Sequence, residues 1–340
     1  MRIVSTLSAD IILAVVAAYY KLRVHLSMNI LVTGCNGFVG SALIDDLDSI
    51  SDIVVTGVCR DKQYSANSDK KVLHTSSLAL LDDQHTILQS TDVLIHTAGK
   101  AHVMEKNDSD DEQVYFHVNT QLTIELARMA ASYGVKRFIY LSSTKVFGDP
   151  VPPAVCFNSV SPTNPTDVYG ESKLQAELEL TSIAKETGLE VVIIRPPLVY
   201  GQGVKGNMAM LAKLVRSNLP LPFGAISTNR RSMVSLENLI DLVRHCLSNP
   251  DAIGQTFLVS DDNDLSTFEI ICLLKRYLGS KSIVFSVPKY ILYAIGCVTG
   301  STSKINRLVE SSVVDIEHTK TTLNWSPPQS VEKAFENMVK

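Results

Sequence analysis

A tyrosine and a lysine stand four positions apart near the start of a predicted helix, in the segment PTDVYGESKLQAELEL at 165–180. Residues at i and i+4 lie on one face of a helix, so the ammonium of Lys173 can act on whatever the phenol of Tyr169 touches. A phenol is ionised in roughly one molecule per thousand at pH 7, and a cation within about 4–6 Å stabilises the ionised form. The pair therefore predicts acid/base chemistry with Tyr169 as the proton carrier.

The same spacing recurs at Tyr277 and Lys281, where the glycine between them is typical of a helix end. A surface helix whose tyrosine packs and whose lysine is solvated also explains such a pair. The spacing alone does not identify a site, so further motifs have to point at Tyr169.

Glycines recur every third position after the first predicted strand, in ILVTGCNGFVG at 30–40. In dinucleotide-binding turns the first glycine permits a tight turn, the second lets a pyrophosphate approach the backbone, and the third lets helix and strand pack closely. A purely structural turn is the alternative. We expect Gly34, Gly37 and Gly40 to bind a dinucleotide.

The second predicted strand ends in VCRDK, where the adenosine ribose of such a cofactor is expected. An acidic residue at this point favours the free 2′-hydroxyl of NAD, whereas a cation such as Arg60 favours the extra phosphate of NADP. Asp61 follows directly and keeps NAD open. The expected cofactor is NADP or NAD, with NADP favoured.

Short β-branched runs alternate with longer helical runs from Met28 onward. Strands are predicted at 29–33, 53–59, 93–97, 137–143 and 190–196, and helices over VGSALIDDL and over VNTQLTIELARMAASYG, which ends at Gly134. This alternation predicts a parallel sheet, and the continuous apolar strands indicate that both of its faces are covered. The expected fold is α/β, a Rossmann-type doubly wound parallel sheet.

The residue pattern changes after Arg195, where turn-rich segments such as PPLVYGQGVKGN begin. We expect a dinucleotide-binding domain at 28–195 and a smaller mixed α/β substrate domain at 196–340, which can return strands or helices to the first domain. Residues 1–27 contain an apolar run between Ala9 and Tyr20 that is shorter than the roughly 20 residues that a bilayer span needs. We interpret them as an extension outside the fold, with Met28 as the natural start, and they are the only part for which a membrane partner is expected.

Composition bounds the class of protein. With 340 residues, 45% of them hydrophobic and 19% charged, the chain can bury a large core. A net charge of −4 and the absence of a long basic run exclude nucleic acid as the main partner. The six cysteines are scattered without a C-x-x-C pair or zinc spacing, which favours a reducing, cytoplasmic compartment and no metal.

An ordered set of motifs runs along the chain: the glycine turn, HTAG at 96–99, Asn119, LSSTKVFG at 141–148, the Tyr169 and Lys173 pair, and RPPLVYG at 195–201. Together they resemble the extended short-chain dehydrogenase/reductase family, in particular its NAD-dependent nucleotide-sugar epimerases, dehydratases and 4-keto-sugar reductases. The likeness extends from Met28 to the closing helix signature LNWSPPQSVEKAF.

The resemblance implies that Ser143, Tyr169 and Lys173 are catalytic. Ser143 would hydrogen-bond the reacting sugar oxygen, while Lys173 would lower the pKa of Tyr169 and bind the nicotinamide ribose. Hydride would move between a sugar carbon and nicotinamide C4 while Tyr169 carries the proton. The cofactor-binding residues implied are Thr33, Gly34, Asn36, Gly37, Phe38, Val39, Gly40, Arg60, Ser77, Leu78, Thr97, Ala98, Gly99, Asn119, Tyr169, Lys173 and Pro196.

The resemblance also implies a UDP-sugar substrate bound by Ser143, Asn207, Arg231 and Arg307. A guanidinium suits a diphosphate because it can bind two oxygens at once. Solvated arginines and a helix-capping asparagine are the alternatives. A homodimer built from helices at 111–133 and 169–187 is expected in addition.

Departures from the family pattern narrow the reaction. Thr144-Lys145 stands where the dehydratases carry an Asp-Glu pair, which argues against a dehydratase, and Ser77 stands where an aspartate commonly binds adenine. Arg60 and Ser77 favour a cofactor that exchanges on every cycle. The segment RPPLVYGQGVKGN followed by RRSMV further resembles a subgroup from bacterial polysaccharide clusters that includes reductases. The main expectation, implied by this resemblance, is reduction of a UDP-4-keto-6-deoxy-N-acetylhexosamine in bacterial polysaccharide synthesis. The alternatives are a UDP-glucose or UDP-N-acetylglucosamine 4-epimerase with tightly bound NAD, and a non-catalytic NADP-binding sensor.

Overall fold

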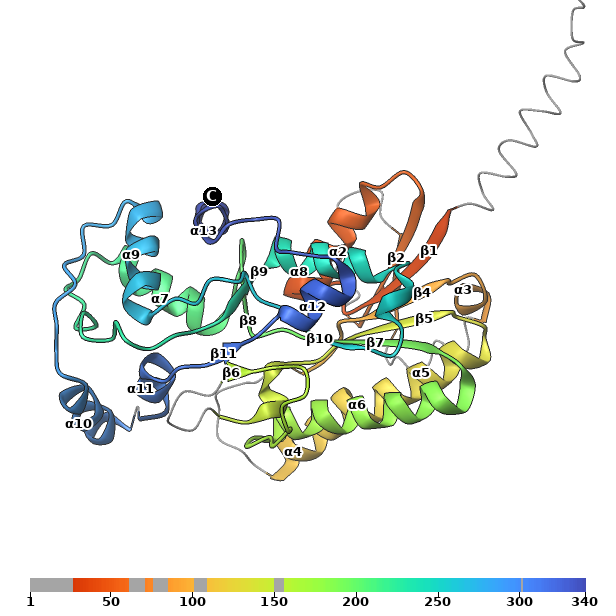
Figure 1. Ribbon diagram of the computed structural model, residues 1–340, viewed down its shortest axis with the longest axis horizontal. Coiled ribbons are helices and arrows are strands. Elements are labelled where there is room, and N and C mark those ends of the chain that lie inside the picture. Colours follow the sequence, from red (N-terminus) through yellow and green to blue (C-terminus); the bar gives the residue numbers. More distant parts are fainter. Residues whose placement is uncertain (1–26, 61–70, 76–84, 101–108, 150–155, 301) are drawn as a thin grey trace, which may run out of the picture.

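A parallel sheet forms the centre of the molecule (Figure 1). The computed structural model describes residues 27–60, 71–75, 85–100, 109–149, 156–300 and 302–340. The sheet has seven strands in the order β10-β7-β5-β4-β1-β2-β3, and every neighbouring pair is parallel. Its strands are β1 (Met28–Thr33), β2 (Ile53–Cys59), β3 (Lys71–His74), β4 (Val93–His96), β5 (Arg137–Leu141), β7 (Glu190–Arg195) and β10 (Thr256–Leu258). The predicted Rossmann-type fold class is confirmed.

Helices cover both faces of the sheet, as Figure 1 shows. One layer holds α2 (Phe38–Asp48), α8 (Leu236–Cys246) and α12 (Glu317–Leu323). The other holds α4 (Ser109–Phe116), α5 (Leu122–Ser132) and α6 (Val168–Thr187), with α3 (His85–Gln89) just before the start of β4. Successive strand residues feed opposite layers: Ile30 and Val32 of β1 join the core under α2 and α8, and Leu31 joins the core under α5 and α6. The sheet is therefore buried on both faces, which explains its unbroken apolar strands.

The later half of the chain builds a smaller unit beyond the carboxyl ends of the strands. It contains α7 (Gly206–Arg216), α9 (Thr267–Leu278) and α13 (Val331–Val339), packed around Tyr200, Leu274 and Phe335. Two short parallel pairs connect it to the sheet domain: β8 (Leu198–Tyr200) with β9 (Met233–Ser235), and β6 (Cys156–Phe157) with β11 (Val313–Val314). Its outer edge is formed by α10 (Lys289–Thr299) and α11 (Thr302–Val309).

The chain crosses back to the sheet domain after residue 196. Strand β10 adds to the sheet beside β7, and α8 packs against α2. The sheet and its covering layer thus depend on segments from both halves of the sequence. A single cut at 195 does not separate two independent cores, since one apolar cluster contains Leu43 of α2 together with Leu239 and Val243 of α8.

No helix in the described ranges is long and apolar enough to cross a bilayer. The apolar segment before Ser27 lies outside those ranges.

A buried ion pair fixes α6 to the edge of the sheet. Arg195, the last residue of β7, donates from Nε to Glu177 Oε1 at 3.0 Å and from Nη2 to Oε2 at 2.5 Å. Their side chains are 10% and 4% exposed, and the guanidinium lies 5.0 Å from the ring centre of Phe147. Removing one partner of such a pair leaves the other charge buried without compensation.

Glu177→Ala is therefore expected to lower the free energy of unfolding by about 3–5 kcal/mol. The matched control is Glu186→Ala, because Glu186 lies on the same helix and pairs with Arg128, with both side chains about half exposed. Urea unfolding followed by circular dichroism measures both variants. Equal losses of stability would show that burial of the pair does not set its contribution.

Candidate functional site

The carboxyl ends of four neighbouring strands meet at one edge of the sheet, where ligands of open α/β sheets bind. A cavity of about 330 Å³ lies there. The cavity brings together many residues predicted from the sequence: Gly37, Phe38, Val39, Gly40, Thr97, Gly99, Ser143, Tyr169, Lys173 and Pro196. Lys100, Leu141, Ser142, Pro197 and Val199 also line it and were not predicted.

A neighbouring cavity of about 130 Å³ continues along the sheet edge to the end of β2. It is lined by the predicted residues Gly34, Asn36, Arg60 and Ala98, and by Val58, Cys59, Val118 and Leu122. The two cavities share Gly37, Thr97 and Gly99, so together they form an elongated site across the glycine turn. This shape suits an extended dinucleotide. Ser77 and Leu78, predicted beside the adenine, lie outside the described residues.

Close packing fixes the glycine turn. Gly34 has φ +74°, and a Cβ there would lie 2.7 Å from the backbone nitrogen of Ala98. A Cβ at Gly40 would lie 2.7 Å from the hydroxyl oxygen of Thr97. The turn between β1 and α2 is therefore pressed against the end of β4, and side chains at these positions would separate the two.

The first turn of α2 faces the cavity without a side chain to cap it. Gly37 is the N-cap residue, and no acidic residue lies in the first turn. The free backbone N–H groups and the positive end of the helix dipole at such a terminus attract anions. This local geometry favours the diphosphate of a dinucleotide.

The start of α6 explains the residues between the tyrosine and the lysine. Asp167 caps the helix by accepting a hydrogen bond from the Gly170 nitrogen at 2.7 Å. A Cβ at Gly170 would lie 2.5 Å from the Lys145 carbonyl oxygen, so only glycine allows this approach. Ser172 donates to the Tyr169 carbonyl at 2.8 Å. The sequence YGESK therefore sets the start of α6 against the loop after β5.

Asn119 is fully buried and links two segments of the site. Its Oδ1 accepts from the Lys100 nitrogen at 2.8 Å, and its Nδ2 donates to the Lys100 carbonyl at 3.2 Å and to Ser172 Oγ at 3.0 Å. Asn119 lies in a π-helical turn, His117–Gln121, between α4 and α5. Such turns are rare and often mark functional sites. The sequence pattern predicted an ordinary helix here and missed this turn.

Lys173 is a buried cation. Its Nζ donates to the Leu141 carbonyl at 2.8 Å and lies 4.6 Å from the ring centre of Tyr140. Burial lowers the pKa of Lys173 to about 8, with Glu177 opposing the shift. The carbonyl and the ring hold the ammonium at the sheet edge.

His96 beneath this cation stays neutral. Burial and the charge of Lys173 lower the pKa of His96 to about 3. Its two ring nitrogens lie 2.7 Å from Thr33 Oγ1 and 2.9 Å from Thr123 Oγ1. Thr33, predicted as a cofactor residue, therefore supports the site from below and lines neither of the two cavities.

Tyr169 differs from the expectation in one respect. Burial raises the pKa of Tyr169 to about 12, Asp167 and Tyr115 add to this rise, and a hydrogen bond with Ser143 opposes it. The expectation that Lys173 makes the phenol acidic is therefore not met in the chain by itself, because burial raises the pKa of Tyr169 and the hydrogen bond with Ser143 only partly opposes that rise. The expected contact between Tyr169 and Ser143 is present.

Ser142 provides a test of whether the cavity fits a polar ligand. Its side chain is 4% exposed and lines the cavity, yet its Oγ has no hydrogen-bond partner in the described structure. A buried hydroxyl without a partner is unfavourable by about 1–3 kcal/mol. A bound dinucleotide would bring amide and hydroxyl groups that could satisfy it. With the open glycine turn, this makes the residues present compatible with NAD.

The predicted substrate residues meet in a separate cavity of about 130 Å³. Asn207, Arg231 and Arg307 line it together with apolar side chains such as Met208, Leu211, Phe223 and Ile270. Arg231 donates to the Glu310 carbonyl at 3.3 Å, and burial lowers its pKa. Asn207 is the second residue of α7 and its N-cap is Lys205, so helix capping does not explain the asparagine.

Strand β8 separates this cavity from the one at the sheet edge. Leu198 lines the cavity of the arginines, whereas Pro197 and Val199 line the cavity of Tyr169. Neighbouring residues of a strand point to opposite sides, so a single strand contributes to both. The arrangement can accommodate a substrate whose reacting sugar and nucleotide occupy adjacent sites.

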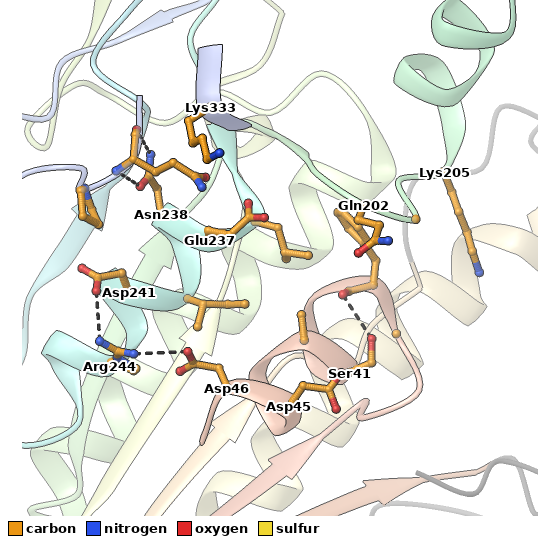
Figure 2. A pocket seen from close by; sticks show the side chains of 18 of the residues that line it. Ser41, Asp45, Asp46, Gln202, Lys205, Glu237, Asn238, Asp241, Arg244 and Lys333 are labelled. Atoms are coloured by element: carbon orange, nitrogen blue, oxygen red, sulfur yellow. Dashed lines mark hydrogen bonds and ion pairs between the residues drawn. The ribbon is translucent and has the colours of Figure 1, made fainter. Parts of the chain in front are cut away.

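A larger cavity, about 1110 Å³, lies behind the glycine turn between α2, α8 and the start of α13 (Figure 2). Four carboxylates line it, from Asp45, Asp46, Glu237 and Asp241, against the cations of Lys205, Arg244 and Lys333. Arg244 is already paired with Asp46 at 3.2 Å and with Asp241 at 3.3 Å. This lining disfavours an anionic dinucleotide, so we assign the chemistry to the smaller cavities at the sheet edge.

No group of three or more His, Cys, Asp or Glu within the described ranges could hold a metal ion.

Comparisons with known proteins agree with this geometry. The model of the "NAD dependent epimerase/dehydratase family" matches residues 30–260. A UDP-glucose 4-epimerase of Vibrio cholerae is 40% identical over 309 residues, which cover 91% of this chain and 93% of that protein. An N-acetyl-alpha-D-glucosaminyl-diphospho-ditrans,octacis-undecaprenol 4-epimerase of Escherichia coli O157:H7 is 25% identical over 278 residues, covering 80% of this chain and 78% of that protein.

A solved structure has the same fold. The UDP-glucuronic acid 4-epimerase of Bacillus cereus in complex with NAD superposes with a TM-score of 0.74 at 21% identity, covering 92% of this chain and 95% of that one. The family match and the Vibrio cholerae relative both extend across the glycine turn and the Tyr169 and Lys173 pair. The chain belongs to the NAD-dependent epimerase/dehydratase family of the extended short-chain dehydrogenases/reductases.

Proposed function

We propose that this protein is an NAD-dependent 4-epimerase that interconverts the C4 epimers of a UDP-hexose, with UDP-glucose or UDP-N-acetylglucosamine as substrate. The observation that carries the proposal is the meeting of Ser143, Tyr169 and Lys173 in one cavity with the glycine turn. A relative at 40% identity is named a UDP-glucose 4-epimerase, which favours this reaction over its alternatives.

The reductase expected from the sequence finds no support among the relatives, which are named as 4-epimerases. The preference for NADP depended on Arg60, which is exposed at the end of β2. The related Bacillus cereus structure holds NAD. NAD is therefore the proposed cofactor, and Arg60 would lie beside its adenosine ribose.

Tyr169 and Ser143 would handle the proton of the sugar hydroxyl. Bound NAD would supply a hydride acceptor and a positive charge beside the phenol. Tyr169 would then give up its proton more readily, since a nearby positive charge favours the phenolate. Ser143, already hydrogen-bonded to Tyr169, would hold the C4 oxygen while Tyr169 accepts its proton and later returns it.

Lys173 would orient the cofactor ribose and add positive charge near the phenol. Its ammonium is held by Leu141 and cannot swing out to solvent without losing that hydrogen bond. Asn119 fixes Lys100 and Ser172 on either side of the site. The keto sugar would rotate within a rigid site, because epimerisation requires both faces of its C4 carbonyl to reach the same hydride.

The two substrate arginines would bind the diphosphate of the nucleotide sugar. Arg231 and Arg307 line one cavity with Asn207, and the apolar side chains there would contact the base. A UDP-sugar therefore fits as the substrate class. The expected homodimer stays a proposal, with residues 111–133 (from α4 to the end of α5) and 169–187 (α6) as its interface; Leu178 of α6 is exposed in the single chain.

The non-catalytic sensor alternative is disfavoured because a sensor needs none of the three catalytic side chains. Tyr169→Phe removes only the phenolic oxygen and is expected to lower kcat by about 10²–10⁴ while NAD stays bound. Tyr277→Phe is the matched control, since this tyrosine also precedes a lysine by four positions but packs in the core of the smaller unit. Interconversion of UDP-glucose and UDP-galactose measures both, and equal rates in the wild type and Tyr169→Phe would overturn the assignment.

Cofactor retention separates the epimerase from the reductase. An epimerase regenerates its cofactor on every cycle, so purified protein is expected to carry NAD(H) and to act without added cofactor. Chromatography of the nucleotides released by denaturation, together with turnover in cofactor-free buffer, makes the measurement. Turnover only on a 4-keto sugar, with one NADPH consumed per product, would establish the reductase instead.

The buried lysine predicts how stability depends on pH. Lys173 has a pKa of about 8 in the folded chain against an ordinary value of 10.5. Between these values the unfolded chain keeps a proton that the folded chain has lost, so the free energy of unfolding rises with pH in this window. Wild type is expected to gain stability relative to Lys173→Met from pH 8 to 10.5, by at most about 1.4 kcal/mol per pH unit, with a constant difference below pH 8.

Urea unfolding at several pH values tests this dependence. Lys185→Met, at an exposed position of the same helix, is the control and should leave the pH slope of wild type unchanged. A difference in the free energy of unfolding between wild type and Lys173→Met that does not change with pH would show that burial does not lower the pKa of Lys173 in the folded chain.

A further inference from the structure

Exposed apolar side chains are concentrated in one stretch of the chain, 283–298, which ends in α10 at the outer end of the smaller unit. Fourteen large hydrophobic residues are exposed in the described structure, and six of them fall within 283–298: Ile283, Phe285, Tyr290, Ile291, Ile295 and Val298. Tyr290 is 71% exposed and Val298 is 89% exposed. Single exposed apolar residues need no explanation, but a cluster of this kind marks an interaction surface.

Helix α10 is apolar on both of its faces. Leu292 and Gly296 form its buried face, with Gly296 packed against Ile305 of α11, while Ile291 and Ile295 stand exposed. A helix that is hydrophobic all round is normally covered on every side by protein or lipid. Figure 1 shows α10 at the outer end of the smaller unit, with α11 beside it.

The charged side chains of the segment between Glu269 and Glu310 are all positive. Between Glu269 and Glu310 the sequence contains no aspartate or glutamate, although the whole chain has a net charge of −4. The same stretch carries Lys275, Arg276, Lys281, Lys289, Lys304 and Arg307. An apolar face within a basic segment complements a surface that is apolar inside and negatively charged outside, which is the character of an anionic bilayer.

We propose that α10 docks this protein on the surface of an anionic lipid bilayer. The exposed residues of α10 would enter the boundary between headgroups and acyl chains, with Tyr290 in the interfacial position that tyrosine favours. The helix has 11 residues and is too short to cross the bilayer, so it would lie in the surface.

The docked face lies next to the proposed substrate cavity. Helix α11, which packs on α10, contributes Arg307 and Leu308 to the cavity that also contains Asn207 and Arg231. Docking would therefore hold that cavity at the bilayer surface. The proposed surface consists of described residues of α10, whereas the sequence led us to expect a membrane contact only at residues 1–27.

The test compares binding of the full chain to vesicles of equal parts phosphatidylcholine and phosphatidylglycerol with binding to vesicles of phosphatidylcholine alone. We expect cosedimentation with the anionic vesicles, weakened by high salt because exposed charges are screened. Val298→Glu places a negative charge on the exposed face and is expected to lower the partition coefficient by at least about tenfold. Ile295→Glu, near the middle of the helix, is a second variant with the same expected effect.

Val160→Glu is the matched control, because Val160 is 86% exposed but lies away from α10 in the turn before α6. It should bind as wild type does, and thermal unfolding by circular dichroism checks that all variants are folded. Absence of wild-type binding to anionic vesicles would overturn the proposal, as would equal binding of wild type and both α10 variants. A dimer in solution that Val298→Glu and Ile295→Glu convert to monomer would assign the face to a second copy of the chain and overturn it as well.

Discussion

The buried ammonium of Lys173 is the constraint on which the arrangement of the site depends. A cation inside a protein is unfavourable unless its surroundings compensate for the lost hydration. Here the carbonyl of Leu141 and the ring of Tyr140 provide that compensation, and His96 below stays neutral because burial, and then the charge of Lys173, lower its pKa. The end of β5, the end of β4 and the face of α6 therefore have to meet at one point.

Helix α6 connects this point to the rest of the fold. Its first turn carries Tyr169, capped by Asp167 and pressed against the loop after β5 through Gly170. About two turns later Glu177 binds Arg195 at the end of β7. The same helix thus holds the proposed acid/base residue and the buried ion pair of the core. A change that loosens the ion pair would also displace the start of the helix, so stability and chemistry are coupled here.

The two ends of the molecule have opposite characters. At the sheet edge polar groups are buried, and the Ser142 hydroxyl has no hydrogen-bond partner in the described structure. At the outer end of the smaller unit apolar groups are exposed on α10 in a segment without acidic residues. The cavity of Arg231 and Arg307 lies between them, bounded on one side by β8 and on the other by α11. Both ends depart from the usual distribution of polar and apolar groups, and each departure carries one of the two functional proposals.

The sequence by itself determined the features that depend on local order along the chain. The apolar runs predicted five strands of the sheet, and the structure has each of them with ends within two residues of the prediction. The glycine turn and the Tyr169 and Lys173 pair could also be identified from the sequence, because the spacing of such motifs is set by helix and strand geometry. The family resemblance added Ser143 and Asn119, which no spacing rule would have selected.

Only the tertiary structure decided the features that depend on distant segments. Strand β10 joins β7 across about sixty residues of sequence, and β3 was not among the strands predicted from the apolar runs. The π-helical turn contains Asn119, whose side chain bonds to Lys100 and Ser172. The pKa of Tyr169 rises because the fold buries the phenol, whereas the sequence suggested only a nearby cation. The exposure of α10 could not be predicted from the sequence either, since an apolar run has the same sequence pattern whether the fold buries it or leaves it exposed. Spacing encodes which residues can meet, but burial is set by everything that packs around them.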